Sequence, residues 1–161
     1  MSGAGRPTTS DESARDATGM RVAIVAGRWN ATIADGLIAG AQRSLDAAGV
    51  SWDLIRVEGS FELAIVARAA LDAGAEAVVA LGVIIRGGTP HFEYVSSATT
   101  QALSRVALDT GKPVGFGVLT LDDEQQGIAR AGLPGSTEDK GGEAAHAAVD
   151  TALVLRGLRT H

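Results

Sequence analysis

The sequence predicts an α/β protein in which helices cover both faces of a parallel four-stranded sheet. Three observations favour this class. Four short apolar segments alternate with stretches of helical periodicity. The longest of these segments is apolar without alternation, as expected for a strand that is covered on both faces. The connections are long enough for the right-handed helical crossovers that parallel strands require.

The four strands are predicted where apolar residues run together. Residues 20–27 (MRVAIVAG) end in glycine, and residues 77–85 (AVVALGVII) form the longest apolar run, which is typical of a central strand. Residues 51–57 (SWDLIRV) are more polar, so this strand is placed near an edge of the sheet. Residues 112–121 (KPVGFGVLTL) supply the fourth strand.

The helices are predicted from capping residues and from apolar side chains repeated every three or four positions. Asn30, Ser60 and Thr89 are placed as N-caps of the first three helices. Pro90 then occupies a first helical position, where its missing N–H costs nothing. Glycines end these helices. The predicted helices cover residues 30–49, 60–74, 89–111, 124–131 and 143–158.

These elements predict a flavodoxin-like fold of three layers (α/β/α) with the strand order 2-1-3-4. Residues 19–161 form one domain. Residues 1–18 are small and polar, without the apolar segment of a signal peptide, and are predicted to be a disordered tail. Because so small a sheet leaves an edge open, the chain is expected to form a homo-oligomer.

Composition excludes several classes of function. The sequence has no cysteine, which rules out disulfides, thiolate metal sites and a catalytic thiol. The net charge is −5 and no cluster of Lys and Arg stands out, so nucleic-acid binding is not expected. The longest apolar run has nine residues, too few to span a membrane. No spacing of His, Asp and Glu resembles a metal-ligand set. A cytoplasmic protein without a metal is therefore expected.

Candidate site residues follow the strands, where ligands of open parallel sheets bind. Trp29 follows the first strand, residues 58–62 (EGSFE) follow the second, and residues 84–91 (IIRGGTPH) follow the third. The glycines of this last stretch leave backbone N–H groups open at a helix N-terminus, which favours a phosphate. His91 is a candidate for proton transfer, because an imidazole can both accept and donate a proton.

Each of these signals alone has a plainer interpretation. The glycine turn could be an ordinary link between strand and helix, and Trp29 could cover the core. Arg130, Lys140 and Glu62 could be solvated surface residues, as His146 and His161 are expected to be. The turn has neither the lysine of a Walker loop nor the GxGxxG pattern, so a nucleoside triphosphate is disfavoured.

Five segments together resemble the lumazine synthase family. They are GVIIRGGTPHFEYV (82–95), EGSFE (58–62), FGVLT (116–120), EQQGIARAG (124–132) and EDKGGEAA (138–145), in matching order and spacing. The resemblance extends from Gly19 nearly to the C-terminus. It implies an enzyme of riboflavin biosynthesis that condenses 5-amino-6-(D-ribitylamino)uracil with 3,4-dihydroxy-2-butanone 4-phosphate. The products are 6,7-dimethyl-8-ribityllumazine, phosphate and water, and no metal or organic cofactor takes part.

The resemblance also implies a role for each matched residue. Trp29 would stack on the pyrimidine, and His91 would transfer protons. The other residues implied to bind the pyrimidine substrate are Ser60, Phe61 and Glu62 at the ribityl chain, Val83, Ile84 and Ile85 at the heterocycle, and Phe116, which closes the ring pocket. Those implied to bind phosphate are Gly88, Thr89, Arg130 and, with a weaker match, Lys140. Phe116 and Arg130 would come from a neighbouring subunit.

The family assembles as pentamers, some of which build shells of sixty subunits. In this chain, the segment 132–141 (GLPGSTEDKG) is extended and contains a proline, which favours a pentamer or a pair of pentamers. Three alternatives stay open at this point: a related riboflavin synthase, a non-catalytic protein that binds lumazine or flavin, and an FMN carrier.

Overall fold

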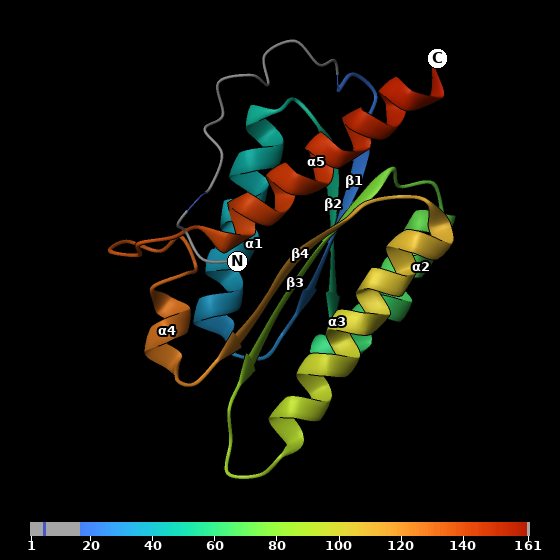
Figure 1. The fold of residues 1–161 in the computed structure, drawn as a ribbon. Helices are drawn as coiled ribbons and strands as arrows, with labels where there is room; N and C mark the ends of the chain where they lie inside the picture. The colour runs from blue at the N-terminus through green and yellow to red at the C-terminus, as the bar shows by residue number, and fades with distance from the viewer. Residues whose placement is uncertain (1–4, 6–16, 161) are drawn as a thin grey trace.

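The computed structural model describes Gly5 and residues 17–160. Most of the predicted N-terminal tail therefore lies outside the described residues. The sheet has four parallel strands in the order β2-β1-β3-β4 (Figure 1), as predicted. The strands are β1 (Arg21–Gly27), β2 (Ser51–Val57), β3 (Ala77–Ile85) and β4 (Val114–Leu121). The more polar β2 lies at an edge, and the apolar β3 lies inside the sheet.

Helices cover both faces of the sheet and complete the three layers (Figure 1). Those packed on one face are α1 (Ala31–Ala47) and α5 (Lys140–Arg159), and those on the other are α2 (Leu63–Asp72) and α3 (His91–Thr110). A short 3-10 helix, η2 (Ser60–Glu62), precedes α2, and a short α4 (Glu124–Ile128) follows β4. The arrangement is the flavodoxin-like fold that the sequence predicts.

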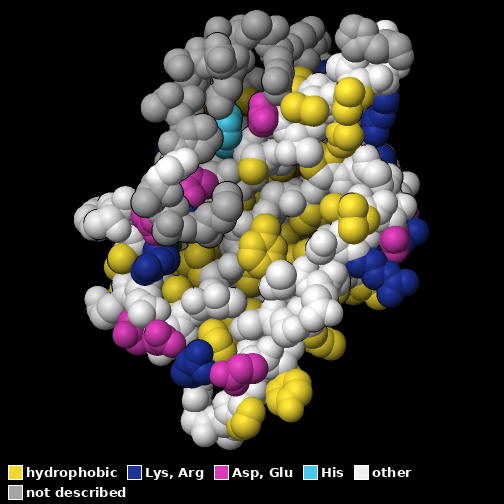
Figure 2. Space-filling model, viewed as in Figure 1, with side chains coloured by type: hydrophobic (Ala, Val, Ile, Leu, Met, Phe, Trp, Pro, Cys, Tyr) yellow, Lys and Arg dark blue, Asp and Glu magenta, His cyan; other side chains and the backbone are white. Residues whose placement is uncertain are grey.

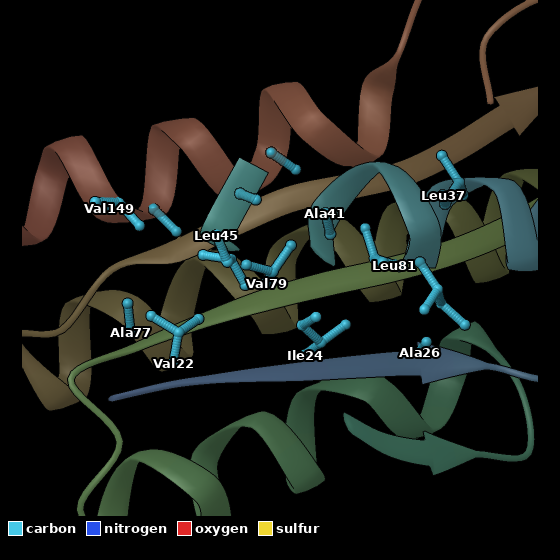
Figure 3. Close-up of a cluster of buried hydrophobic side chains, with 14 of the residues drawn as sticks. Val22, Ile24, Ala26, Leu37, Ala41, Leu45, Ala77, Val79, Leu81 and Val149 are labelled. Carbon is cyan, nitrogen blue, oxygen red and sulfur yellow. The ribbon is translucent and has the colours of Figure 1, made fainter. Parts of the chain in front are cut away.

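Alternate residues of each inner strand contribute to two separate cores. Ile24 of β1 packs in the cluster beneath α1 and α5, whereas Val25 packs in the cluster beneath α2 and α3. Figure 3 shows the first cluster, in which Leu37 of α1 and Val149 of α5 lie on the same side of the sheet as Val79 of β3. Because both faces are buried, an inner strand has no polar face, which explains its continuous apolar sequence.

The three predicted N-caps are confirmed only in part. Asn30 stands at the N-cap of α1, but Gly59 rather than Ser60 precedes η2, and Pro90 rather than Thr89 precedes α3. Asn30 precedes α1 but its side chain makes no capping hydrogen bond. Ser60 lies inside η2, and the turn is closed by Gly59 and Glu62 instead: the Gly59 N–H donates to Glu62 Oε2 at 3.1 Å, and the Glu62 N–H donates to the Gly59 carbonyl at 3.2 Å. A carboxylate three residues along the chain thus replaces the expected hydroxyl cap.

The last helix begins at Lys140, three residues earlier than predicted. Its cap is Asp139, whose carboxylate accepts the Gly142 N–H at 3.0 Å. The pair of glycines at 141 and 142 suggested a loop, but their small size serves close packing, since a Cβ on Gly141 would overlap the backbone of Leu37 in α1. Tertiary contact overrides the poor helix propensity of glycine here.

One ion pair fixes the C-terminal half of α5 to the start of β3. Arg156 donates to both carboxylate oxygens of Glu76, at 2.6 and 2.7 Å, and both side chains are partly buried. The hydrogen bond from Arg156 lowers the pKa of Glu76 below its ordinary value of 4.5. Because the pKa of Glu76 is lower in the folded than in the unfolded state, the ionised carboxylate stabilises the protein at neutral pH. This stabilisation is lost as the pH falls through the folded-state pKa.

Glu76→Gln should therefore lower the free energy of unfolding at pH 7 by about 1 kcal/mol. The difference from wild type should shrink steadily below about pH 4.5, as the wild-type carboxylate becomes protonated. Urea denaturation across pH 3 to 7 measures both effects. Asp109→Asn, which removes the exposed pair with Arg105 on α3, is the control and should change little. A deficit in Glu76→Gln that is independent of pH would contradict the assignment.

Candidate functional site

A cavity of about 1050 Å³ opens at the carboxyl ends of β1, β2 and β3. This is the edge of the sheet where the sequence places the site. The loops that follow the three strands form one side, and the first two turns of α3 form the other. The lining residues are Trp29, Asn30, Gly59, Ser60, Phe61, Glu62, Val83, Ile84, Ile85, Gly87, Thr89, His91, Phe92, Tyr94, Val95 and Ala98.

Most of the residues predicted for the pyrimidine substrate lie in this lining. Val83 and Ile84, at the end of β3, are buried and form its apolar floor. Trp29 and Phe61 lie at its rim, with 65% and 68% of their surfaces exposed. Two large aromatic faces that are left open to solvent beside an apolar floor suit a flat heterocycle.

Ser60 is a buried polar residue in this apolar surrounding. Its hydroxyl has no hydrogen-bond partner in the described part of the chain. Gly82 of β3 leaves room for it, because a Cβ at position 82 would overlap Ser60 Oγ. A buried hydroxyl without a partner costs free energy. A polar group of a bound molecule would satisfy it.

Arg86 holds the glycine turn between β3 and α3 at both ends. Its backbone N–H donates to the Leu121 carbonyl at 2.7 Å, and the Nε of its side chain donates to Asp122 Oδ1 at 3.0 Å. Its guanidinium also bonds to Glu93 and lies 4.3 Å from the ring centre of Phe92. These hydrogen bonds from Arg86 lower the pKa of Asp122 and of Glu93 below their usual values. The arginine thus joins the ends of β3 and β4 to the first turn of α3.

The turn that Arg86 secures is open on its outer side. A Cβ at Gly87 or Gly88 would meet no atom within 4 Å. Thr89 Oγ1 accepts the His91 N–H at 3.4 Å, so this hydroxyl helps to begin α3. Gly87, Thr89 and His91 line the cavity, while Gly88 lies between them without being part of its wall. An oxyanion can approach the backbone closely at such a turn.

Besides Gly88, three predicted residues do not line the cavity of the single chain. Phe116 lies on the edge strand β4 with 47% of its surface exposed. Figure 2 shows hydrophobic side chains gathered along this edge, between α3 and α5. Arg130 and Lys140 lie beside each other after α4, where the Lys140 N–H donates to the Arg130 carbonyl at 2.9 Å. The entry of Phe116 and Arg130 into the site of a neighbouring subunit stays a prediction, as does the binding of phosphate by Lys140.

Glu138 lies between these two cations. Its carboxylate oxygens are 3.6 Å from Arg130 Nε and 3.6 Å from Lys140 Nζ, and Lys140 is also 2.9 Å from Glu143. Arg130 Nη1 donates to the Gln126 carbonyl at 2.9 Å. The backbone and these carboxylates therefore hold both cations in place.

Sequence reasoning missed several residues of the cavity wall. The predicted helix 89–111 places Phe92 and Val95 in an apolar stripe that is expected to pack on the sheet, and Tyr94 lies outside that stripe. In the structure, Tyr94 is 75% exposed. Their helical spacing follows from the sequence, but the face of α3 that meets the cavity depends on how α3 packs against the sheet. The missed residues are Phe92, Tyr94, Val95 and Ala98, whereas Gly59 and Gly87 belong to the candidate stretches 58–62 and 84–91, and Asn30 directly follows Trp29.

Two further observations on the described residues concern metal binding and membrane-spanning helices. No group of three or more His, Asp and Glu side chains among residues 17–160 could hold a metal ion. None of the helices in the described part of the chain has both the length and the apolar character needed to cross a bilayer.

The fold and the cavity define an open α/β protein that binds small molecules at the carboxyl edge of its sheet. A family model described as 6,7-dimethyl-8-ribityllumazine synthase matches residues 19–156. The chain belongs to this family.

Curated relatives with that same name resemble the chain over nearly its whole length. The protein of Leifsonia xyli is 70% identical over 159 residues, which cover 99% of each chain. That of Clavibacter michiganensis is 69% identical with the same coverage. The protein of Kineococcus radiotolerans is 56% identical over 98% of this chain and 96% of its own.

Proposed function

We propose that this chain is a transferase of riboflavin biosynthesis that makes 6,7-dimethyl-8-ribityllumazine. Its substrates are 5-amino-6-(D-ribitylamino)uracil and 3,4-dihydroxy-2-butanone 4-phosphate, and it also releases phosphate and water. The observation that carries the proposal is the cavity, which is found in a chain that belongs to this family. An aromatic rim, a buried hydroxyl, an open glycine turn and an imidazole meet there.

The pyrimidine substrate binds at the aromatic rim. Trp29 stacks on its ring, and the apolar end of β3 (Val83, Ile84 and Ile85) lies against the heterocycle, where backbone groups can pair with its polar edge. Residues 60–62 hold the ribityl chain. The unpaired Ser60 hydroxyl and the exposed carboxylate of Glu62 are suited to hydroxyl groups.

The phosphate binds at the open turn of Gly88 and Thr89. The N-terminus of α3 favours an anion there, and the glycines let it come close. Arg130 and Lys140 of a neighbouring copy add positive charge. A guanidinium can bond to two phosphate oxygens at once.

The reaction needs positioning and proton transfer. The primary amine attacks the ketone, and the adduct loses water to give an imine. Phosphate then leaves, and the ribitylamino nitrogen attacks the remaining carbonyl carbon, whose oxygen departs as a second water when the second ring closes. His91, between the glycine turn and the cavity, moves protons in these steps without a metal or organic cofactor.

His91→Ala should lower kcat by about 10² to 10⁴-fold but leave measurable activity. Activity remains because positioning of two reactive substrates supplies much of the acceleration by itself. Steady-state kinetics with both substrates measures the loss. His146→Ala, on α5 and outside the cavity lining, is the matched control and should keep wild-type turnover. Equal turnover in the two variants would remove His91 from the mechanism.

The active enzyme is a homo-oligomer, and we propose a pentamer or a pair of pentamers. The exposed apolar edge at β4 supports self-association, and Phe116 of one copy would close the ring pocket of the next. Light scattering measures the mass. A particle of megadalton size would instead indicate a closed shell, and a fully active single subunit would contradict shared sites. We place the activity in the cytoplasm, because a charged sugar phosphate does not cross membranes unaided.

A two-substrate assay tests the proposed function. The purified chain should convert the two substrates to lumazine, which is followed by its absorbance and fluorescence. Incubation with lumazine alone should give no riboflavin, whereas a riboflavin synthase would produce it. A chain that binds lumazine but makes none would be a non-catalytic binding protein. Stoichiometric bound flavin would indicate an FMN carrier.

A further inference from the structure

Asn30 has an unusual backbone conformation. With φ 57° and ψ 65°, it is the only residue other than glycine with a positive φ among Gly5 and residues 17–160. Residues with a Cβ disfavour this left-handed region, although asparagine tolerates it better than most. Conformations of this kind persist only where the surroundings hold them, and they gather at functional sites.

Helix capping does not explain this conformation. A residue that caps a helix normally has an extended backbone and accepts a hydrogen bond through its side chain, but the Asn30 side chain makes no such bond. Its carbonyl still accepts the Ala34 N–H at 2.9 Å, so the helix begins normally. The left-handed residue instead turns the chain from β1 into α1 within three residues, 28–30, directly after Trp29.

Gly59, after β2, meets the same tryptophan from the other side. A Cβ at position 59 would lie 3.1 Å from Trp29 Cδ1 and 3.4 Å from Trp29 Nε1. The indole edge therefore lies directly against the Gly59 backbone. The extended φ of −150° at Gly59 suits any residue, so a larger residue here would be opposed only by the indole, which it would displace by a few tenths of an ångström.

The backbone also holds these two loops together. The Arg28 N–H donates to the carbonyls of Val57 and Glu58, at 3.0 and 3.3 Å. The Gly59 N–H donates to the Glu62 carboxylate at 3.1 Å. The two loops that flank the Trp29 indole are therefore held in place in the free protein, although 65% of Trp29 is exposed.

We propose that Asn30 and Gly59 are positioning residues that fix the Trp29 indole as a preformed shelf for a flat heterocyclic ring. Asn30 does so through its left-handed backbone, and Gly59 by leaving its surface bare for the indole edge. The inference rests on the proposed function, because the ring is that of the ribitylaminouracil or of the lumazine product. A shelf that is ordered in advance spares the ligand the entropic cost of ordering an exposed side chain.

Asn30→Ala and Asn30→Gly separate backbone conformation from the loss of the amide. Alanine resists the left-handed region, whereas glycine adopts it freely. The probe is 6,7-dimethyl-8-ribityllumazine, titrated against Trp29 fluorescence. Trp52→Phe removes the other of the two tryptophans in the sequence, and all variants are made in this background after thermal melts show that each is folded.

Asn30→Ala should bind the lumazine about three- to tenfold more weakly, and Asn30→Gly should recover most of this loss. Gly59→Ala should weaken binding to a similar extent, because the indole must move. In steady-state kinetics, the KM for the pyrimidine should rise in Asn30→Ala and Gly59→Ala. The KM for the butanone phosphate should stay within about twofold, since its turn is elsewhere in the cavity. The near-ultraviolet circular dichroism of Trp29 should weaken in Asn30→Ala and return in Asn30→Gly.

Several results would overturn the inference. One is equal binding by the alanine and glycine variants at position 30, and another is a parallel rise of both KM values. Trp29→Ala is the reference, in which binding is followed by the fluorescence of the lumazine itself because no tryptophan remains. Unchanged lumazine binding in that variant would mean that no shelf exists, even if the wild type makes lumazine. A wild-type chain that makes no lumazine in the two-substrate assay would overturn the proposed function itself, so the two failures are distinguishable.

Discussion

Replacing Arg130 with alanine should raise the KM for the butanone phosphate by about 30- to 150-fold, as expected for a charge-assisted hydrogen bond of about 2–3 kcal/mol. The guanidinium is held in place by the Gln126 carbonyl and by Glu138, so it is already ordered when an anion arrives. The KM for the pyrimidine should change little, because the residues proposed for that substrate lie on other loops. Steady-state kinetics with each substrate varied in turn measures both constants.

Two further variants make this test specific. Glu138→Gln removes the carboxylate that lies between Arg130 and Lys140, so inorganic phosphate should inhibit this variant more strongly than wild type. Arg105→Ala removes an equally charged residue from the exposed side of α3, where its side chain is 82% exposed, and it should have no effect. An unchanged KM for the butanone phosphate in Arg130→Ala would exclude this residue from the phosphate site.

Gly141→Ala should lower the free energy of unfolding by about 3 kcal/mol, the upper range for an overpacked contact. An added Cβ would overlap the Leu37 carbonyl oxygen and would lie 2.7 Å from the Leu37 carbonyl carbon. Both atoms belong to the backbone of α1, so no side chain can rotate away. The helices α1 and α5, which together cover one face of the sheet, must therefore move apart. Urea denaturation measures the change.

Gly157→Ala is the matched control in the same helix. A Cβ at this position would meet no atom within 4 Å. Alanine has the higher helix propensity, so this variant should be as stable as wild type or more stable by up to about 1 kcal/mol. If the two substitutions changed stability equally, close packing of α1 on α5 would not be the reason for glycine at position 141.

The strands could be predicted from sequence because their burial leaves a direct signature. β3 is covered on both faces and is apolar throughout, while β2 has polar residues because it lies at an edge. The beginnings of helices were harder to predict. At Asn30 the backbone is left-handed without a side-chain cap, and at Asp139 the cap precedes two glycines that resemble a loop. At the second of these places, the contact of Gly141 with the Leu37 backbone in α1 explains the glycine that a local pattern assigns to a loop.

The residues of the cavity wall could be predicted only in part, because some of them depend on contacts between segments that are far apart in the chain. Loops that follow parallel strands meet at one edge, so Trp29, Ser60 and His91 could be brought together from topology alone. The contributions of Phe92 and Tyr94 depend on how α3 is turned about its axis. Arg86 was conspicuous in the sequence, but its partner Asp122 lies 36 residues away, and no periodicity connects the two.

The sequence by itself determined the strand order, the edge of the sheet at which the cavity opens, and most residues that follow the strands there. These features depend on the periodicity and polarity of neighbouring residues, which local sequence records. Only the tertiary structure decided where the tryptophan indole rests, which face of α3 lines the cavity, and where glycine is required for close packing. These depend on the distance between segments that are far apart in the chain, and no local pattern encodes that distance.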